Sequence, residues 1–187
     1  MSEAVHNYKA GKFDTYSGKQ VSILQPKYED IAIEDISMGL ANVCRFGGQI
    51  GRHYSVAIHS LLVMELAPAS LCKPAIIHDA SEAYLGDVIK PLKHILGEKY
   101  AELETLWMRV ICEKYGVDYY ALNAIKKYDM QALEMEHRYI RLRERESKEM
   151  LFMGSFLERF QGKSVVWTAG IYKEHFKKVI IQPVGGW

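Results

Sequence analysis

The chain has 187 residues, of which 49% are hydrophobic and 25% are charged. This composition is ordinary for a globular domain and excludes a disordered or low-complexity chain. The 24 Lys and Arg residues nearly balance the 23 Asp and Glu residues, which gives a net charge of +1. No global field therefore attracts the protein to an anionic polymer, and we expect neither a nucleic acid nor a membrane as its partner.

The cysteines and the N-terminal residues indicate the cellular compartment of the protein. Cys44, Cys72 and Cys112 are few and widely spaced, so they do not predict a disulfide framework. Residues 1–9 lack the apolar core of a signal peptide. No apolar run approaches the roughly 20 residues that span a bilayer. We therefore expect a cytoplasmic protein with reduced thiols.

The first part of the chain predicts a short β-hairpin over residues 13–24. Two short runs rich in strand-forming residues flank a four-residue turn, in which Gly18 allows the reversal. After Pro26 the apolar period changes from two residues to about 3.6, which is typical of helices. No repeat or linker divides the chain, so we expect a single domain over residues 1–187.

The expected helices begin and end at recognisable signals. Ser55 and Asp118 are candidate N-caps, and Gly116 is a candidate C-terminal stop. Together with the hairpin, the pattern predicts an all-α fold in which only residues 150–167 have no assignment. In chain order, helices are expected over residues 33–43, 55–66, 74–85, a short piece within 88–96, 98–115, from 118 through 129 and beyond, and about 168–180.

Four residues with the chemistry of metal ligands lie on otherwise apolar segments. A charged Asp in such a segment is unfavourable unless it is paired, hydrogen-bonded or bound to a metal. Two imidazoles and two carboxylates form a donor set that suits Mn, Co, Ni, Fe or Zn. A hydrogen-bonded His–Asp pair in a helical core is the alternative. The four residues are His59, His78, Asp79 and Asp129.

Two further groups could complete a site. Glu82 follows His78 by four residues, so one continuous helix would place both on the same face. A carboxylate there can orient a water molecule and accept its proton, although a solvated glutamate is the alternative. Arg45 and Arg52 flank a Gly-rich turn, and a guanidinium can bind a phosphate through two parallel hydrogen bonds.

A basic run late in the chain is interleaved with acidic residues. This pattern is typical of a solvated, self-paired helix face and not of a nucleic-acid groove. The basic residues are Arg138, Arg141, Arg143 and Arg145, and the acidic ones are Glu144, Glu146 and Glu149.

Three stretches in this order resemble the HD-domain phosphohydrolases. They are YSVAIHS at residues 54–60, IHDASEAYLGD at residues 77–87 and PLK at residues 91–93. Asp129 follows in a segment of the type Asp-x-x-x-Leu-x-x-Glu, which is similar to that of the family's last ligand. The resemblance covers about residues 14–135. It is greatest to the branch of bacterial 5′-deoxynucleotidases and phage-type deoxynucleoside triphosphohydrolases.

The resemblance implies an HD-domain helical bundle. Its metal-binding helical core would extend over about residues 33–135, and a C-terminal helical extension over about residues 136–187. It implies one divalent transition metal, with additional Mg²⁺ accompanying a triphosphate. The implied metal ligands are His59, His78, Asp79 and Asp129.

The resemblance also assigns roles to individual residues. Glu82 and Asp87 would be the acid–base residues. Arg45, 14 residues before His59, would contact the 5′-phosphate, and Lys93 would lie near the phosphates. Arg52 is a further candidate for phosphate binding.

Recognition of the base is expected at the hairpin, where related enzymes often place an aromatic residue. No aromatic residue stands at positions 21–24 here. We expect Ile23 to contact the base, with simple hairpin packing as the alternative.

The implied activity is cleavage of the 5′ α-phosphate ester of a deoxynucleotide. We expect a triphosphohydrolase that acts on a substrate like dATP and releases the deoxynucleoside and triphosphate. A 5′-deoxynucleotidase that releases phosphate from dNMPs is the first alternative. A non-catalytic nucleotide-binding HD module is the second, and a cyclic-nucleotide or alarmone hydrolase is a further one. The resemblance also implies a homo-oligomer, a dimer or higher.

Overall fold

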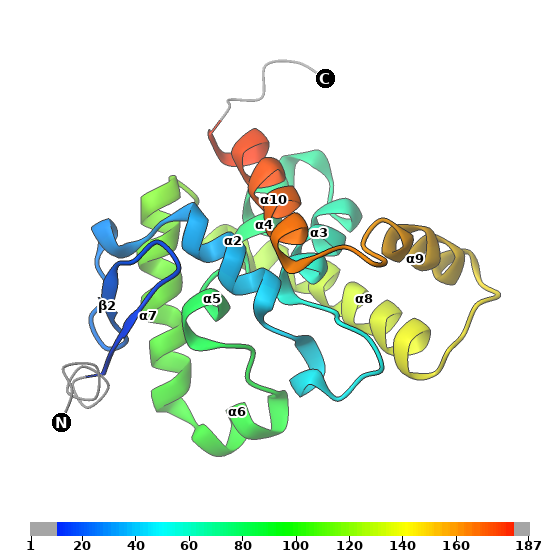
Figure 1. Ribbon diagram of the computed structural model, residues 1–187, viewed down its shortest axis with the longest axis horizontal. Helices are drawn as coiled ribbons and strands as arrows, with labels where there is room; N and C mark the ends of the chain where they lie inside the picture. Colours follow the sequence, from blue (N-terminus) through cyan, green and yellow to red (C-terminus); the bar gives the residue numbers. More distant parts are fainter. Residues whose placement is uncertain (1–10, 182–187) are drawn as a thin grey trace.

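The computed structural model describes residues 11–181, which form a mostly helical molecule with one two-stranded antiparallel sheet (Figure 1). The N-terminal residues 1–9, in which the sequence predicts no signal peptide, lie outside the described residues. The strands are β1 (Lys12–Asp14) and β2 (Gln20–Ser22), and the α-helices are α2 (Ile33–Asn42), α3 (Val56–Leu66), α4 (Cys72–Ile77), α5 (Glu82–Leu85), α6 (Lys90–Leu96), α7 (Glu98–Tyr115), α8 (Lys126–Glu136), α9 (Lys148–Glu158) and α10 (Val165–Phe176).

Shorter helical turns connect these elements. The 3-10 turns are η1 (Tyr28–Asp30), η2 (Arg45–Gly48), η3 (Ala69–Leu71) and η4 (Tyr119–Ala124), and the π-helical turns are η5 (His137–Arg141) and η6 (Lys177–Ile181). In the described part of the chain, no helix has both the length and the apolar character needed to cross a membrane.

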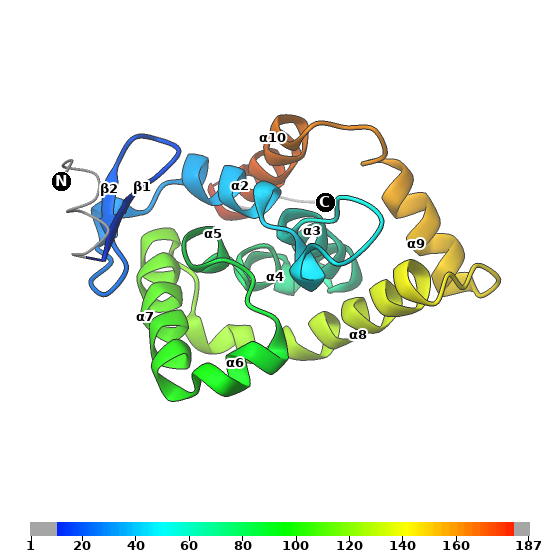
Figure 2. The ribbon, with the colours of Figure 1, turned by 60° about the horizontal axis from the view of Figure 1, so that its bottom comes forward.

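Helix α3 is the centre of the fold. Its residues 56–64 are all buried, and an α-helix that is apolar all round belongs to the interior of a protein. It contacts α2, α4, α8 and α10, and Figure 2 shows these helices around it. The helix starts as predicted, because the Ser55 side chain accepts a hydrogen bond from the backbone N–H of Ile58. This placement puts His59 deep inside the molecule.

Helix α2 packs between α10 and α5. Its buried residues Ile33, Ile36 and Leu40 follow the predicted helical spacing. The helix approaches α5 so closely that a Cβ atom at Gly39 would lie 2.7 Å from the carbonyl oxygen of Ala83. This glycine therefore sets the distance between α2 and the segment that carries Glu82.

The predicted hairpin is present and lies at one end of the molecule (Figure 1). Phe13 pairs with Val21, and Gly18 in the turn has φ of +81°. The buried carboxylate of Asp35 in α2 accepts hydrogen bonds from the backbone N–H and hydroxyl of Ser17. These contacts fasten the hairpin turn to α2.

The expected continuous helix over residues 74–85 is wrong. Helix α4 ends at Ile77 and α5 begins at Glu82. Between them the backbone N–H groups of Ala80 and Glu82 donate to carbonyl oxygens three residues earlier, both at 2.9 Å. This tighter spacing is that of a 3-10 helix, so the interval from His78 to Glu82 is not one turn of a regular α-helix.

Residues 150–167, which have no assignment in the sequence, contain most of α9 and the beginning of α10. Ser147 and Ser164 are the N-caps, because each side chain accepts a hydrogen bond from a backbone N–H of the following turn. The periodicity of α9 is obscured because Leu151 and Phe152 are apolar but exposed. Helix α10 begins three residues before the predicted start.

We expect Gly39→Ala to lower the free energy of unfolding by about 1–3 kcal/mol, because the new methyl group forces α2 away from Ala83. Urea denaturation followed by circular dichroism measures the change. Gly170→Ala in α10 is the matched control, since open space surrounds this helical glycine and alanine should stabilise the helix by about 0.5–1 kcal/mol. Equal effects of the two substitutions would contradict the close packing of α2 and α5.

Candidate metal centre and adjoining cavity

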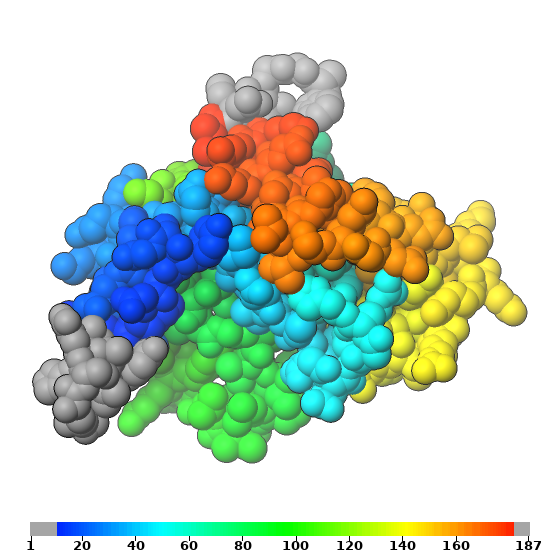
Figure 3. All heavy atoms as spheres, viewed as in Figure 1, coloured from blue at the N-terminus to red at the C-terminus, as the bar shows by residue number. Residues whose placement is uncertain are grey.

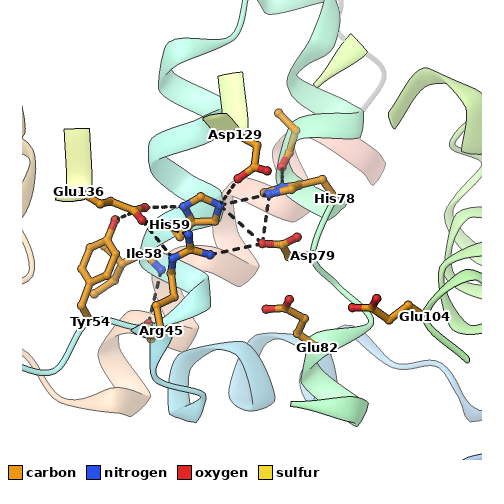
Figure 4. Close-up of polar contacts among 12 residues, drawn as sticks. Arg45, Tyr54, Ile58, His59, His78, Asp79, Glu82, Glu104, Asp129 and Glu136 are labelled. Carbon is orange, nitrogen blue, oxygen red and sulfur yellow. Dashed lines mark hydrogen bonds and ion pairs between the residues drawn. The ribbon is translucent and has the colours of Figure 1, made fainter. Parts of the chain in front are cut away.

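His59 is held in one orientation by a buried carboxylate. Its side chain is fully buried at the middle of α3. The ring Nδ1 lies 2.5 Å from Oε1 of Glu136, and Nε2 points in the opposite direction, towards His78 (Figure 4). Because Glu136 accepts the hydrogen bond from Nδ1, Nε2 is the ring nitrogen that is free to bind a metal when the ring is neutral.

His78 and Asp79 lie on the turn after α4. The His78 Nδ1 donates to the carbonyl oxygen of Ala75 at 2.8 Å, and its Nε2 lies 3.3 Å from Nε2 of His59. Oδ2 of Asp79 lies 3.2 Å from Nε2 of His78 and 3.5 Å from Nε2 of His59. The tight turn therefore directs both side chains to one point (Figure 4).

Asp129 completes the cluster from the first turn of α8. Its Oδ1 lies 3.1 Å from Nε2 of His59. Ligand atoms of His59, His78 and Asp129 all lie within 4.8 Å of one another. The structure thus brings together the four residues that the sequence singles out as metal ligands.

The donor set of this cluster fits a divalent cation. Each imidazole has an acceptor beside its Nδ1, so in the neutral rings the two Nε2 lone pairs converge with two carboxylates. Such an arrangement is repulsive unless a proton or a metal cation lies at its centre. In metalloproteins, the ring nitrogen of a histidine ligand that does not bind the metal also donates a hydrogen bond to such an acceptor, which orients the ring. Two nitrogen and two oxygen donors suit Mn, Co, Ni, Fe or Zn.

A proton can also occupy this centre. Burial and the charge of Arg45 lower the pKa of His59, but Glu136 and Asp129 outweigh them and raise it to about 9. Burial disfavours the charged form of Asp79, yet the neighbouring histidines hold the pKa of that carboxyl well below its usual range. The site therefore favours positive charge at its centre.

Glu136 is the important residue that the sequence analysis missed. Its side chain is fully buried in α8, where Oε2 accepts hydrogen bonds from Nε and Nη2 of Arg45, at 3.2 and 3.0 Å. Oε1 accepts the Tyr54 hydroxyl at 2.9 Å as well as Nδ1 of His59. The signal was its position seven residues after Asp129, which places it two turns along the same helix face.

Glu82 and Lys93 lie beside the metal cluster. Glu82 is buried, and no hydrogen-bond partner for its Oε2 occurs among residues 11–181. Burial, together with the charges of Asp79 and Asp87, raises the pKa of Glu82 to about 9. Lys93 lies 3.3 Å from Oε1 of Glu82 and 2.6 Å from Oε1 of Glu104. The ammonium group of Lys93 is therefore held between the carboxyl groups of Glu82 and Glu104 and is not free for a phosphate.

A cavity of about 530 Å³ opens next to the cluster. Two of the segments that line the cavity are residues 45–49 and 87–93. Figure 3 shows them next to one another on the surface. The lining includes acidic residues Asp79, Glu82, Asp87 and Asp129, basic residues Arg45, Lys90, Lys93 and Arg141, and apolar residues Phe46, Val88, Ile89, Pro91 and Leu133.

The structure does not bring two of the sequence-predicted residues to this cavity. Ile23 lies beside α7, where its carbonyl oxygen accepts a hydrogen bond from the Trp107 indole at 2.9 Å. The hairpin is fastened to α2 and α7, so Ile23 is not placed to contact a base. Arg52 is exposed on the loop before α3 and does not line the cavity.

Comparisons with known proteins place the chain in a family. The chain is 39% identical over 124 residues to the uncharacterized protein YfdR of Escherichia coli (strain K12), and the match covers 66% of this chain and 69% of YfdR. The chain belongs to the YfdR family. It is also 40% identical over 112 residues to the uncharacterized protein RCAP_rcc00048 of Rhodobacter capsulatus, of which it covers 56%. No family model matches the chain.

We expect Glu136→Gln to weaken metal binding about 10–100-fold, as loss of a partner behind a histidine ligand does in other metal sites. The amide can accept from His59 and Tyr54 through its one oxygen only by turning its NH₂ group towards Arg45. Competition with a fluorescent chelator measures the affinity for Mn²⁺ or Zn²⁺. Glu134→Gln, exposed on the same helix, is the matched control. Unchanged affinity in Glu136→Gln would show that Glu136 does not position His59.

Proposed function

We propose that this member of the YfdR family is a divalent-metal-dependent phosphohydrolase that cleaves the 5′ α-phosphate ester of deoxynucleotides. The observation that carries the proposal is one cavity that combines three features. It borders the two-histidine, two-carboxylate cluster, it contains the buried carboxyl of Glu82, and it contains the guanidinium of Arg45. The resemblance to HD-domain phosphohydrolases independently suggests the same chemistry.

Metal ligands and phosphate-binding groups adjoin one another in this cavity. His59, His78, Asp79 and Asp129 would hold the ion, and a divalent ion there would polarise a phosphoryl oxygen and make a water molecule more acidic. Arg45 lies 3.8 Å from Oδ2 of Asp79, so its guanidinium reaches the edge of the cluster. A phosphate bound between the cluster and Arg45 would meet positive charge on both sides.

Glu82 is suited to move protons during the reaction. Hydrolysis joins a water oxygen to phosphorus and breaks the bond from phosphorus to the 5′-oxygen, which leaves with a proton as the deoxynucleoside. Oε2 of Glu82 has no competing partner in the described residues and can accept the water proton when ionised or donate one when protonated. Asp87 is a second carboxyl on the same cavity, and burial raises its pKa.

The apolar part of the cavity would contact the nucleoside. Val88, Ile89, Pro91 and Leu133 line it on α8 and on the segment before and at the start of α6. An apolar surface next to a polar anchor is the usual arrangement of a small-molecule site. It takes the role that the sequence analysis gave to the hairpin. The preference for a deoxyribose rests on the resemblance alone.

We expect the metal-loaded protein to release phosphate or triphosphate from deoxynucleotides. All four dNMPs and all four dNTPs are offered separately with Mn²⁺ or Co²⁺, and ion-exchange chromatography identifies the products. Glu82→Gln should lower kcat at least about 100-fold while retaining the metal, because it removes the proton-transfer group. Glu102→Gln, exposed on α7, is the matched control and should keep full activity.

The product decides between the two enzyme alternatives. Triphosphate from dNTPs supports a triphosphohydrolase, and orthophosphate from dNMPs supports a 5′-deoxynucleotidase. If the metal-loaded protein hydrolyses none of the eight substrates, the proposal is wrong. Nucleotide binding without turnover would then favour the non-catalytic module.

A further inference from the structure

The four basic residues of the cavity differ in how their charges are balanced. Arg45 donates two hydrogen bonds to Glu136, and Lys93 binds both Glu82 and Glu104. These two cations are thus neutralised by carboxylates of the protein itself. Glu136 and Glu104 do not line the cavity, so the negative charges that neutralise Arg45 and Lys93 come from residues outside its lining.

Lys90 and Arg141 are different. Both side chains are exposed and line the cavity, and neither forms an ion pair with any residue between 11 and 181. The guanidinium carbon of Arg141 lies 5.3 Å from the centre of the Phe46 ring. Phe46 itself has φ of +58°, a backbone conformation that is rare for a residue with a side chain. The Phe46 ring also lines the cavity and lies within cation–π distance of two guanidinium groups, because that of Arg45 lies 5.7 Å from the same ring centre.

The end of α8 explains how Arg141 reaches this position. The helix widens into the π-helical turn η5, where the backbone N–H of Leu142 donates to the carbonyl oxygen of His137 at 3.1 Å. Such π-helical turns occur often at functional sites.

Two other members of the basic run, Arg138 and Arg145, have structural partners. Arg138 pairs with Glu144 at 2.8 Å, and Arg145 donates to the backbone carbonyl oxygens of Tyr139 and Glu144. Arg138 is thus self-paired as expected, whereas Arg141 is exposed as expected but has no ion-pair partner among residues 11–181.

We infer that Arg141 and Lys90 form an oligophosphate subsite at the exposed end of the cavity, beyond the position of the α-phosphate. This inference rests on the proposed function and adds its substrate class, a nucleotide with two or more phosphates. A guanidinium can hold a phosphate through two parallel hydrogen bonds, and the ammonium of Lys90 adds a second positive charge. A monophosphate bound next to Arg45 and the metal cluster needs neither residue.

Isothermal titration of the metal-loaded full-length chain with inorganic triphosphate, and separately with orthophosphate, tests the subsite after free metal is removed. We expect Arg141→Gln to weaken triphosphate binding about tenfold or more, as loss of a charge-assisted hydrogen bond does. Lys90→Gln should weaken it in the same direction. Both variants should bind orthophosphate within about twofold of the unchanged protein, because neither side chain belongs to the proposed α-phosphate position at Arg45 and the metal cluster.

Arg143→Gln is the matched control, because Arg143 belongs to the same basic run but does not line the cavity. An equal loss in Arg143→Gln would show a diffuse charge effect and overturn the inference. Unchanged triphosphate binding in Arg141→Gln, or an equal loss of orthophosphate, would also overturn it.

The outcomes separate this inference from the proposed function. Hydrolysis of deoxynucleotides with no effect of Arg141→Gln on triphosphate binding refutes the subsite alone. Triphosphate binding that depends on Arg141, in a protein that hydrolyses no deoxynucleotide, refutes the proposed function alone.

Discussion

The fully buried carboxylate of Glu136 is the interaction on which the candidate site depends. It neutralises Arg45, accepts the Tyr54 hydroxyl and fixes the ring of His59. These partners come from α3 and the loop before it, whereas Glu136 comes from α8, so one side chain joins segments that lie far apart in the sequence. Removing one partner from a buried charged group is strongly destabilising, typically by about 3–5 kcal/mol, because the remaining charge stays desolvated. The same carboxylate therefore stabilises the fold and orients the candidate metal ligand His59.

Charge around the cavity is arranged in two layers. Glu136 neutralises Arg45 in a buried setting, Glu104 pairs with the partly exposed Lys93, and neither carboxylate lines the cavity. The cavity itself is lined by Asp79 and Asp129 of the candidate metal cluster, by the buried Glu82 and by the exposed Arg141. Under the proposed function, an anionic substrate would pass from the exposed Arg141 to the desolvated Arg45. Electrostatic interactions strengthen along that path because the effective dielectric constant falls towards the interior.

Irregular backbone supplies much of the geometry. The 3-10 spacing between α4 and α5 turns His78 and Asp79 to one point. Phe46, whose φ is positive, and Arg141, in the π-helical turn after α8, both line the cavity. Each departure from regular helix interrupts the hydrogen bonding that gives a helix its stability. Packing of α3 and α8 against the surrounding helices compensates for these losses, and local irregularity of this kind is concentrated at functional sites.

The sequence alone determined the mostly helical class, the hairpin and the N-cap at Ser55, and it singled out the four residues of the candidate metal cluster. Asp118 is an N-cap as well, but of the 3-10 turn η4 and not, as expected, of the helix that carries Asp129. These features depend on local patterns, such as apolar period, capping chemistry and spacing along one segment. Only the tertiary structure decided that Glu136 supports His59, that Lys93 is held by Glu104, that Ile23 lies away from the cavity and that Arg141 lines it. A side chain's partner is set by which distant segments pack together, and packing depends on the whole core, so no local pattern of residues encodes it.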